Sequence, residues 1–315
     1  MARALVTGAS GFAGSYLVRY LLGLGYEVAG GVHGPAREMP EGCRTIPLDV
    51  TDTEGFSETV AEVLPDEVYS LAGVTRPASG AVSEFYRVNL EGTLNLLEAV
   101  REHAPESKVL LVGSAYAYGC AATPIPETAP LNPVNHYGVS KAAADLLGYS
   151  YALQGLRIVR VRPFNHTGPE QSPDFLLPTL VRQFVGIRAG KREPIINLGN
   201  LASVRDLSDV RDVVRGYQLA LQRDRSGEAY NLGSGREVSV RELFELVSRK
   251  AEVEAELRVE PSRVRATDIP YLVADVSKAS RELGWEAEIP LEKTVQDMLD
   301  TASRLSAKYR TRWPT

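Results

Sequence analysis

The stretch ARALVTGASGFAGSYLVRYLLGL, residues 2–24, decides the fold. It opens with a short apolar run that ends at Thr7, passes through a glycine-rich turn, and continues from Phe12 with apolar residues at the spacing of a helix. This pattern predicts a buried strand, a tight turn and a helix. Since strands that alternate with helices build α/β folds, the beginning of the chain predicts an α/β protein.

The same alternation continues through the first half of the chain. Apolar runs at 27–32, 44–48, 67–72, 108–113 and 157–162 predict strands, and helical patterns cover 55–64, 83–103 and 135–153. Alternating strands and helices predict a parallel sheet that is covered by helices on both faces. The expected fold class is therefore α/β, with a Rossmann-type doubly wound parallel sheet.

The character of the sequence changes after residue 165. Pro169, Pro173, Pro178 and Pro194 separate short segments, which is typical of loops and helices laid over a binding cleft. A helical pattern at 209–222 precedes a strand pattern at 228–232, and we expect this strand to return to the first sheet. Residues 1–165 plus about 204–233 are thus predicted to form the Rossmann domain. The remaining residues are predicted to form a smaller, discontinuous C-terminal substrate domain, about 166–203 plus 234–315.

Composition excludes several classes of function. The chain has 315 residues, 44% hydrophobic and 24% charged, with a net charge of -5 and interleaved signs, so we expect a globular protein without a nucleic acid partner. Cys43 and Cys120 are far apart, which favours the cytoplasm. No apolar run approaches the ~18 residues of a membrane span. The histidines lack metal-ligand spacing, so neither a membrane nor a metal is expected.

The glycine turn has the spacing G-x-x-G-x-x-G. Glycines at such a turn allow close backbone approach to a pyrophosphate, and the helix that follows offers free N–H groups and the positive end of its dipole. We therefore expect a dinucleotide there, held by Gly8, Ser10, Gly11, Phe12, Ala13 and Gly14. The alternative is a glycine turn that binds nothing, which the flanking strand and helix disfavour.

Further candidates follow other predicted strands, because ligands of parallel sheets bind at the carboxyl ends of the strands. Asp49 and Val50 follow one strand, and Leu71, Ala72 and Gly73 end the next. Asp49 could accept a hydrogen bond from an adenine amine, or could be a helix cap or turn residue.

The end of the second predicted strand bears on the choice of cofactor. It carries His33 and, later, Arg37, and lacks the acidic residue that binds a ribose 2′-hydroxyl. NADP is therefore favoured, with NAD as the alternative. Arg37 could equally be a solvated surface residue.

Tyr137 and Lys141 are four residues apart, on one face of the predicted helix at 135–153. A free tyrosine has a pKa of about 10. A tyrosine that shuttles protons near neutral pH therefore needs a nearby cation, which Lys141 and an oxidised nicotinamide would supply. Ser114, at the end of the strand at 108–113, could hydrogen-bond the reacting oxygen. Alone, Y-x-x-x-K would more often be an ordinary helix segment.

In this order, the glycine turn, the strand-end serine and Y-x-x-x-K resemble the extended short-chain dehydrogenase/reductases. The resemblance runs from Ala4 to about Leu299. It implies that Ser114, Tyr137 and Lys141 form the catalytic triad and that the lysine also holds the nicotinamide ribose. It further implies a homodimer built through the helices at 83–103 and 135–153.

Motifs in the second half resemble the GDP-mannose branch of that family, including its GDP-4-keto-6-deoxy-D-mannose reductases. These motifs are RPFNHTGP at 162–169, RDLSDVRD at 205–212, YNLGSG at 230–235 and RATDIP at 265–270, which leads to Trp285. The resemblance implies a GDP-sugar substrate, with Asn165, Arg205 and Arg265 around its diphosphate and Lys191 near the base. Arginine suits phosphate oxygens. Arg205 could instead form a surface pair with Asp206, and Trp285 is expected in the core.

The residues after Ser114 narrow the reaction. Sugar 4,6-dehydratases of this family have an acid there, because removing water needs its own general acid/base. Ala115 and Tyr116 follow Ser114 here, which disfavours dehydration. We expect NADPH-dependent reduction of the C4 ketone of GDP-4-keto-6-deoxy-D-mannose to GDP-D-rhamnose. The alternatives are a UDP-hexose 4-epimerase with bound NAD and a catalytically silent protein that senses a dinucleotide.

Overall fold

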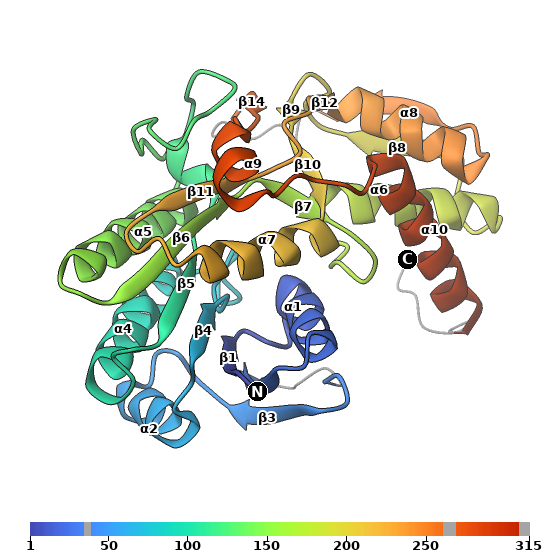
Figure 1. The fold of residues 1–315 in the computed structure, drawn as a ribbon. Coiled ribbons are helices and arrows are strands. Elements are labelled where there is room, and N and C mark those ends of the chain that lie inside the picture. Colours follow the sequence, from blue (N-terminus) through green and yellow to red (C-terminus); the bar gives the residue numbers. More distant parts are fainter. Residues whose placement is uncertain (35–38, 261–268, 309–315) are drawn as a thin grey trace.

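A seven-stranded sheet forms the centre of the computed structural model, which describes residues 1–34, 39–260 and 269–308. Its strand order is β11-β6-β5-β4-β1-β2-β3, and every neighbouring pair is parallel. The strands are β1 (Arg3–Thr7), β2 (Glu27–Val32), β3 (Cys43–Pro47), β4 (Glu67–Ser70), β5 (Lys108–Val112), β6 (Arg157–Pro163) and β11 (Ala229–Leu232). The predicted Rossmann-type sheet is confirmed, including the return of β11 to it (Figure 1).

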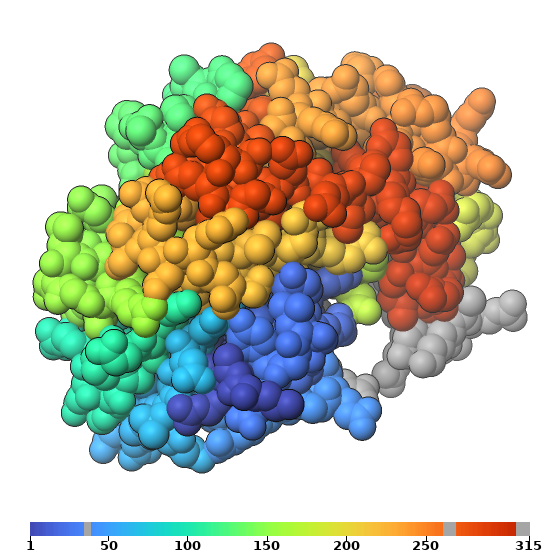
Figure 2. Space-filling view, in the orientation of Figure 1, coloured from blue at the N-terminus to red at the C-terminus, as the bar shows by residue number. Residues whose placement is uncertain are grey.

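Helices cover both faces of this sheet. One face carries α1 (Phe12–Gly23), α7 (Val210–Arg223) and α9 (Ser277–Leu283), and the other carries α2 (Thr53–Val63), α4 (Gly92–His103) and α5 (His136–Leu153). Side chains of β1 alternate between the faces, so that Ala4 and Val6 join the first core and Leu5 joins the second. In the space-filling view, α7 and α9 form a continuous layer above the blue N-terminal part (Figure 2).

The helix predicted at 83–103 contains a π-helical turn. It consists of α3 (Ser83–Tyr86), the π-helix η1 (Arg87–Glu91) and α4. Within η1, the side chain of Asn89 is buried, accepts from the N–H of Val74 at 2.7 Å and donates to Ser140 Oγ at 2.9 Å. Such turns are frequent at functional sites, and here the wider turn carries Asn89, which joins the loop after β4 to α5.

The second half of the chain builds a smaller unit above the carboxyl ends of the strands. Its core lies between α6 (Leu176–Arg188), α8 (Val240–Ala251) and α10 (Leu291–Lys308). Short strands surround it: β7 (Asn165–Thr167) with β10 (Leu207–Asp209), β8 (Ile195–Leu198) with β13 (Glu256–Val259), and β9 (Val204–Arg205) with β12 (Val238–Ser239) and β14 (Tyr271–Leu272). In the part of the chain that the structure describes, none of the helices is both long and apolar enough to cross a membrane.

The predicted division into two domains stays a prediction, but one segment packs outside the domain to which we assigned it. Ala279, Leu283 and Trp285 belong to the core of the Rossmann sheet, together with α7. Trp285 is fully buried and donates through Nε1 to the carbonyl of Asp212 at 2.9 Å, so its predicted place in the core is confirmed.

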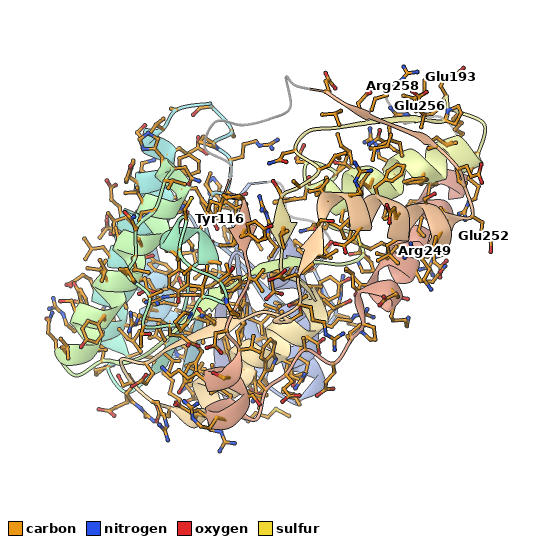
Figure 3. The ribbon with its side chains drawn as sticks, turned by 90° about the horizontal axis from the view of Figure 1, so that it is seen from above. Tyr116, Glu193, Arg249, Glu252, Glu256 and Arg258 are labelled. Atoms are coloured by element: carbon orange, nitrogen blue, oxygen red, sulfur yellow. The ribbon has the colours of Figure 1, made fainter. Side chains whose placement is uncertain are left out.

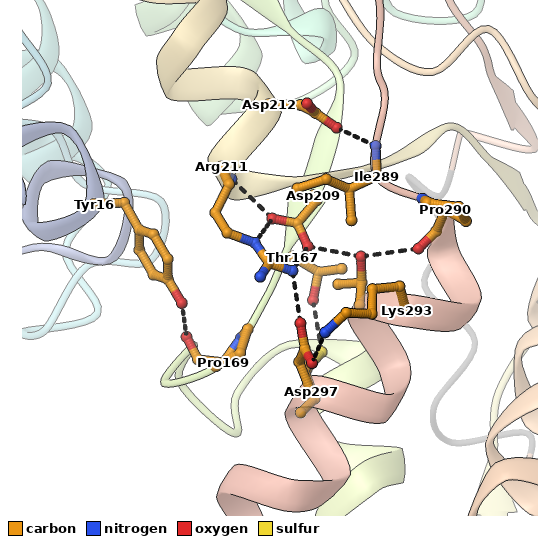
Figure 4. A network of polar contacts seen from close by, with 12 residues as sticks. Tyr16, Thr167, Pro169, Asp209, Arg211, Asp212, Ile289, Pro290, Lys293 and Asp297 are labelled. Carbon is orange, nitrogen blue, oxygen red and sulfur yellow. Dashed lines mark hydrogen bonds and ion pairs between the residues drawn. The ribbon is translucent and has the colours of Figure 1, made fainter. Parts of the chain in front are cut away.

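A buried carboxylate ties α7 to α10 (Figure 4). Asp209, which caps α7, accepts from the N–H of Arg211 at 2.8 Å, from the Arg211 guanidinium and from Thr294 Oγ1 at 2.7 Å. The same guanidinium bridges to Asp297 of α10 at 2.9 Å. Nearby, Tyr16 of α1 donates to the Pro169 carbonyl at 3.0 Å. These contacts hold the second unit against the first.

Replacing Asp209 by alanine should lower the free energy of unfolding by about 3 kcal/mol, because the change removes a helix cap and leaves the Arg211 guanidinium with one carboxylate fewer. Chemical denaturation measures this. The matched control is Asp300→Ala, since Asp300 is exposed and makes one bond, to Gln296. It should change the free energy by no more than about 0.5 kcal/mol. Equal effects of the two substitutions would contradict the role given to Asp209.

Candidate active site

The glycine turn between β1 and α1 leaves no room for side chains, because backbone atoms lie very close to Gly8 and Gly14. Gly8 has a φ of +67°, and a Cβ added to it would lie 2.8 Å from the backbone nitrogen of Ala72. A Cβ on Gly14 would lie 2.1 Å from the carbonyl oxygen of Gly8. Both positions therefore require glycine.

The start of α1 is open to an anion. The helix begins at Phe12 with Gly11 as its N-cap, without a side-chain cap and without an acidic residue in its first turn. Ser10 and Ala13 are half-buried beside it. Its free N–H groups and dipole fit the diphosphate of a dinucleotide.

The end of β4 lies between this turn and the catalytic candidates. Thr7 Oγ1 accepts from the N–H groups of Leu71 at 3.2 Å and Ala72 at 3.1 Å, which joins the ends of β1 and β4. A Cβ on Gly73 would lie 3.0 Å from Asn89 Oδ1 and 3.8 Å from Lys141 Nζ. The predicted cofactor residues of β4 thus border the lysine.

Asp49 is an exposed residue after β3. Its Oδ1 accepts from the N–H of Thr51 at 2.9 Å and from Thr51 Oγ1 at 2.8 Å, and these bonds lower the pKa of the carboxyl. Oδ2 lies 3.8 Å from His33 Nδ1. The end of β2 carries no acidic residue of its own, but the carboxylate of Asp49 lies beside it. Asp49 therefore serves as a turn residue, and a contact with adenine stays a prediction. Val50 packs against Gly92, and Arg37 lies outside the described residues.

Ser114 and Tyr137 meet at the end of β5. Ser114 is buried and caps the short helix η2 (Ala115–Tyr118) by accepting from the N–H of Tyr116 at 3.2 Å. Tyr137 is half-buried. Its ring packs edge-on against Tyr116, with the ring centroids 5.8 Å apart, and lies tilted against Phe85, with the centroids 6.2 Å apart. Burial raises the pKa of Tyr137, and a hydrogen bond with Ser114 opposes the rise. The hydroxyl is consequently held in its protonated form.

The Lys141 ammonium is bonded to the sheet, and its expected effect on the acidity of Tyr137 stays a prediction. The ammonium donates to the carbonyl of Val112 at the end of β5, and the groups that shift the pKa of Tyr137 are Ser114 and Tyr116. Burial lowers the pKa of Lys141 to about 8, and the charge of Asp145 opposes this change.

The predicted substrate residues are only partly brought together. Asn165, on β7, keeps a buried Oδ1 without a hydrogen-bond partner in the described structure. Arg205, on β9, donates to the carbonyls of Val204 at 2.9 Å and Ile269 at 2.7 Å. Asp206 is fully buried and accepts from N–H groups of Ser234, Gly235 and Ala274, so the alternative of a surface pair between Arg205 and Asp206 is wrong.

Lys191 is not brought together with Asn165 and Arg205. Lys191 lies beyond α6, where its ammonium reaches Ser306 of α10 at 3.5 Å. Its near neighbour Glu193 lies at the outer edge of the molecule, away from Tyr116 (Figure 3). Arg265 lies outside the described residues.

Three residues of the site were missed in the sequence. The sequence showed that Tyr116 is not an acid, but it did not show that the Tyr116 ring packs against Tyr137. Asn89 and Asp145 are polar residues inside helical patterns, a signal that marks a buried polar contact without naming its partner. Figure 3 shows Tyr116 between α5 and the second unit, which is where a substrate bound to both would lie.

The fold and the site together define an enzyme of the extended short-chain dehydrogenase/reductase class, with a glycine turn for a dinucleotide and a Ser–Tyr–Lys set beside it. The chain belongs to the GDP-mannose 4,6-dehydratase family, whose family model matches residues 5–298. Enzymes of this class are NAD(P)-dependent and act on nucleotide sugars as oxidoreductases, dehydratases or epimerases.

Individual relatives match over nearly their whole length. The GDP-6-deoxy-D-mannose reductase of Pseudomonas aeruginosa is 33% identical over 310 residues, which cover 96% of this chain and 98% of the relative. A solved structure of RMD from Pseudomonas aeruginosa, complexed with NADPH, has a TM-score of 0.84 and 30% identity, with 97% and 100% covered. The UDP-glucose 4-epimerase of Thermotoga maritima has a TM-score of 0.86 and 25% identity, with 96% and 99% covered.

Replacing Gly14 by alanine should weaken dinucleotide binding at least tenfold, because the new methyl group would collide with the Gly8 carbonyl and open the turn. Titration of the fluorescence of NADPH measures the affinity. Gly23→Ala is the control, since Gly23 ends the same helix and has no atom within 4 Å of an added Cβ. A folded Gly14→Ala protein that binds as tightly as the control would refute the assignment of the turn.

Proposed function

We propose that the protein reduces the C4 ketone of GDP-4-keto-6-deoxy-D-mannose to GDP-D-rhamnose with NADPH. The observation that carries the proposal is the placement of the buried Ser114 beside Tyr137, whose hydroxyl carries its proton near neutral pH because the ordinary pKa of tyrosine is about 10 and burial raises it. A ketone reduction needs a protonated donor beside the carbonyl oxygen. Tyr116 stands two residues after Ser114, where a dehydratase would need an acid, which favours simple reduction.

The side chains divide the work of the reduction. When bound, the dinucleotide supplies the hydride to C4. Tyr137 donates its proton to the developing alkoxide, and Ser114 donates a hydrogen bond to the same oxygen. Lys141, at the cofactor side, places a positive charge that holds the ribose and supports the tyrosinate formed after proton transfer. Tyr116 and Phe85 limit the access of water to the tyrosine.

The preference for a GDP-sugar and for NADPH rests on the relatives and on two features of the site. Asn165 offers a buried, unpartnered Oδ1 at the edge of the second unit, which suits a donor on the substrate. Arg205 lies on a strand of the same unit, and a guanidinium suits a diphosphate. Arg265, Arg37 and Lys191 keep their predicted roles as parts of this proposal. The low cysteine content supports a cytoplasmic location.

The test is an assay with GDP-4-keto-6-deoxy-D-mannose and NADPH. We expect oxidation of NADPH together with one equivalent of GDP-6-deoxyhexose, and product analysis gives the configuration at C4. Tyr137→Phe should lower kcat about a hundredfold or more, because it removes the proton donor, and should leave NADPH affinity within about twofold.

The alternatives give different outcomes in the same experiment. A UDP-hexose 4-epimerase would convert UDP-glucose to UDP-galactose without net oxidation of the cofactor. A silent dinucleotide-sensing protein would bind NADPH and turn over neither sugar. Either result, with no consumption of NADPH in the ketone assay, would refute the proposed reduction.

We also propose a homodimer through α4 and α5, which lie side by side on one face of the sheet (Figure 1). Exposed apolar side chains are spaced seven residues apart along α5: Val139 at 37%, Leu146 at 57% and Leu153 at 72% exposure. Tyr149 and, on α4, Leu94 extend this apolar stripe. A heptad spacing of exposed apolar residues suits the packing of helix against helix.

The double substitution Leu146→Glu and Leu153→Glu should convert the dimer to a monomer, because it places charge in the apolar stripe. Light scattering coupled to size-exclusion chromatography measures the mass. Leu305→Glu, at an exposed leucine of α10, is the control and should remain dimeric. A wild-type protein that is monomeric at micromolar concentration would contradict the proposed dimer.

A further inference from the structure

A buried ion cluster lies behind the catalytic lysine. Asp145 of α5 has 1% of its side chain exposed, and two arginines of β6 bind its carboxylate. Arg162 makes a two-pronged contact, from Nε to Oδ2 at 2.9 Å and from Nη2 to Oδ1 at 2.8 Å. Arg160 adds a bond from Nη1 to Oδ1 at 2.5 Å. Both carboxylate oxygens are therefore occupied by guanidinium groups.

The arginines are themselves held from the other side. Arg162 Nη1 donates to Tyr118 Oη at 2.9 Å and to the Glu127 carbonyl at 3.0 Å, and Tyr118 donates to Asn231 Oδ1 at 2.8 Å. Arg160 Nη2 donates to the carbonyl of Gly227 at 2.6 Å. Since these hydrogen bonds of the two guanidinium groups go to buried or half-buried groups, the cluster has little freedom to rearrange.

Asp145 lies one helical turn beyond Lys141, on the same face of α5. The two side chains line one small cavity together with residues of β4, β5 and α4: Ser70, Leu111, Val112 and Thr93. Lys141 donates to the Val112 carbonyl, and its Nζ lies near Gly73 and Asn89. Among the described residues, Asp145 is the charged group that raises the pKa of Lys141.

The charges facing the lysine can be assigned element by element. On α5 the charged neighbour is Asp145, and Tyr137 is neutral. On β6 the charged residues are Arg160 and Arg162, which bind Asp145 and do not contact the lysine directly. From β4, β5, η1 and α4, the neighbours are uncharged: Ser70, Val112, Asn89 and Thr93. A buried ammonium without a counter-charge tends to lose its proton, so Asp145 is the residue that opposes this loss.

A direct Lys141–Asp145 ion pair would create a different problem, because it would turn the ammonium away from the cofactor. The arginines prevent that pair by occupying both oxygens of the carboxylate. We propose that Asp145, clamped by Arg160 and Arg162, is a positioning residue that keeps the Lys141 ammonium charged while leaving it free to hold the dinucleotide. This inference rests on the dinucleotide-binding role given to Lys141 in the proposed function.

The proposal predicts opposite effects from the two ends of one ion pair. Burial lowers the pKa of Lys141 to about 8, so NADPH affinity should fall as the pH rises through about 8 and the ammonium loses its proton. We call this fall in NADPH affinity at high pH the alkaline limb. Asp145→Asn should lower the pH at which it occurs by about one unit, which is a tenfold change in the protonation equilibrium of Lys141. Arg162→Gln should move the limb up, because a freed Asp145 pairs with the lysine, and should lower kcat.

The experiment is a titration of NADPH fluorescence at pH 6 to 10 on the full chain, with kcat/KM measured alongside. The matched control is Asp224→Asn, since Asp224 pairs with Arg157 at the other end of β6. The control should leave the limb in place. A merely structural role for Asp145 would lower stability in both variants without shifting the limb in opposite directions, and that outcome would overturn the proposal.

A second substitution keeps the test decisive if Asp145→Asn does not fold. Arg160→Gln preserves the two-pronged Arg162 contact and removes one positive charge near Asp145, so its limb should rise by about half a pH unit. An unmoved limb would overturn the proposal. Because the binding titration requires no sugar, a failed ketone assay would refute the proposed function and leave this result intact.

Discussion

The close approach of backbone to backbone at the glycine turn is the constraint on which the rest of the structure depends. A side chain at Gly14 would begin 2.1 Å from the carbonyl oxygen of Gly8, and one at Gly8 would meet the end of β4. Two glycines thus let α1 start directly above the end of β1. The same closeness brings Thr7 into hydrogen-bond reach of Leu71 and Ala72, so the ends of the two central strands form one surface.

The catalytic groups are assembled at the edge of that surface from side chains that burial would otherwise penalise. Burial raises the pKa of Tyr137 and lowers the pKa of Lys141, which favours the neutral form of each. A tyrosine must carry its proton to act as a proton donor. A neutral lysine, in contrast, would lose the positive charge with which it could attract a dinucleotide. The charge of Asp145 opposes the second effect, and a hydrogen bond with Ser114 opposes the first.

Local pattern and chemistry were enough to predict much of this. The periodicity of residues 2–24 identified strand, turn and helix, and the Y-x-x-x-K spacing put Tyr137 and Lys141 on one face of α5. The π-helical turn at Arg87–Glu91 was not predicted, and its residue Asn89 bonds to Val74 and Ser140, residues 15 and 51 positions away that local spacing does not reveal. The bond between the Lys141 ammonium and the Val112 carbonyl was not predictable for a similar reason, because that carbonyl belongs to β5, 29 positions away.

By itself, the sequence determined the doubly wound sheet, the position of the glycine turn and the placement of Tyr137 and Lys141 on one helix face, because all of these follow from periodicity and short-range spacing. Only the tertiary structure decided which charges surround Lys141, that Asp206 is buried and that Trp285 packs on the Rossmann core. Burial and ion pairing depend on residues that are distant in the chain and meet only when the helices pack on the sheet. Their electrostatic consequences could therefore not be obtained from spacing alone.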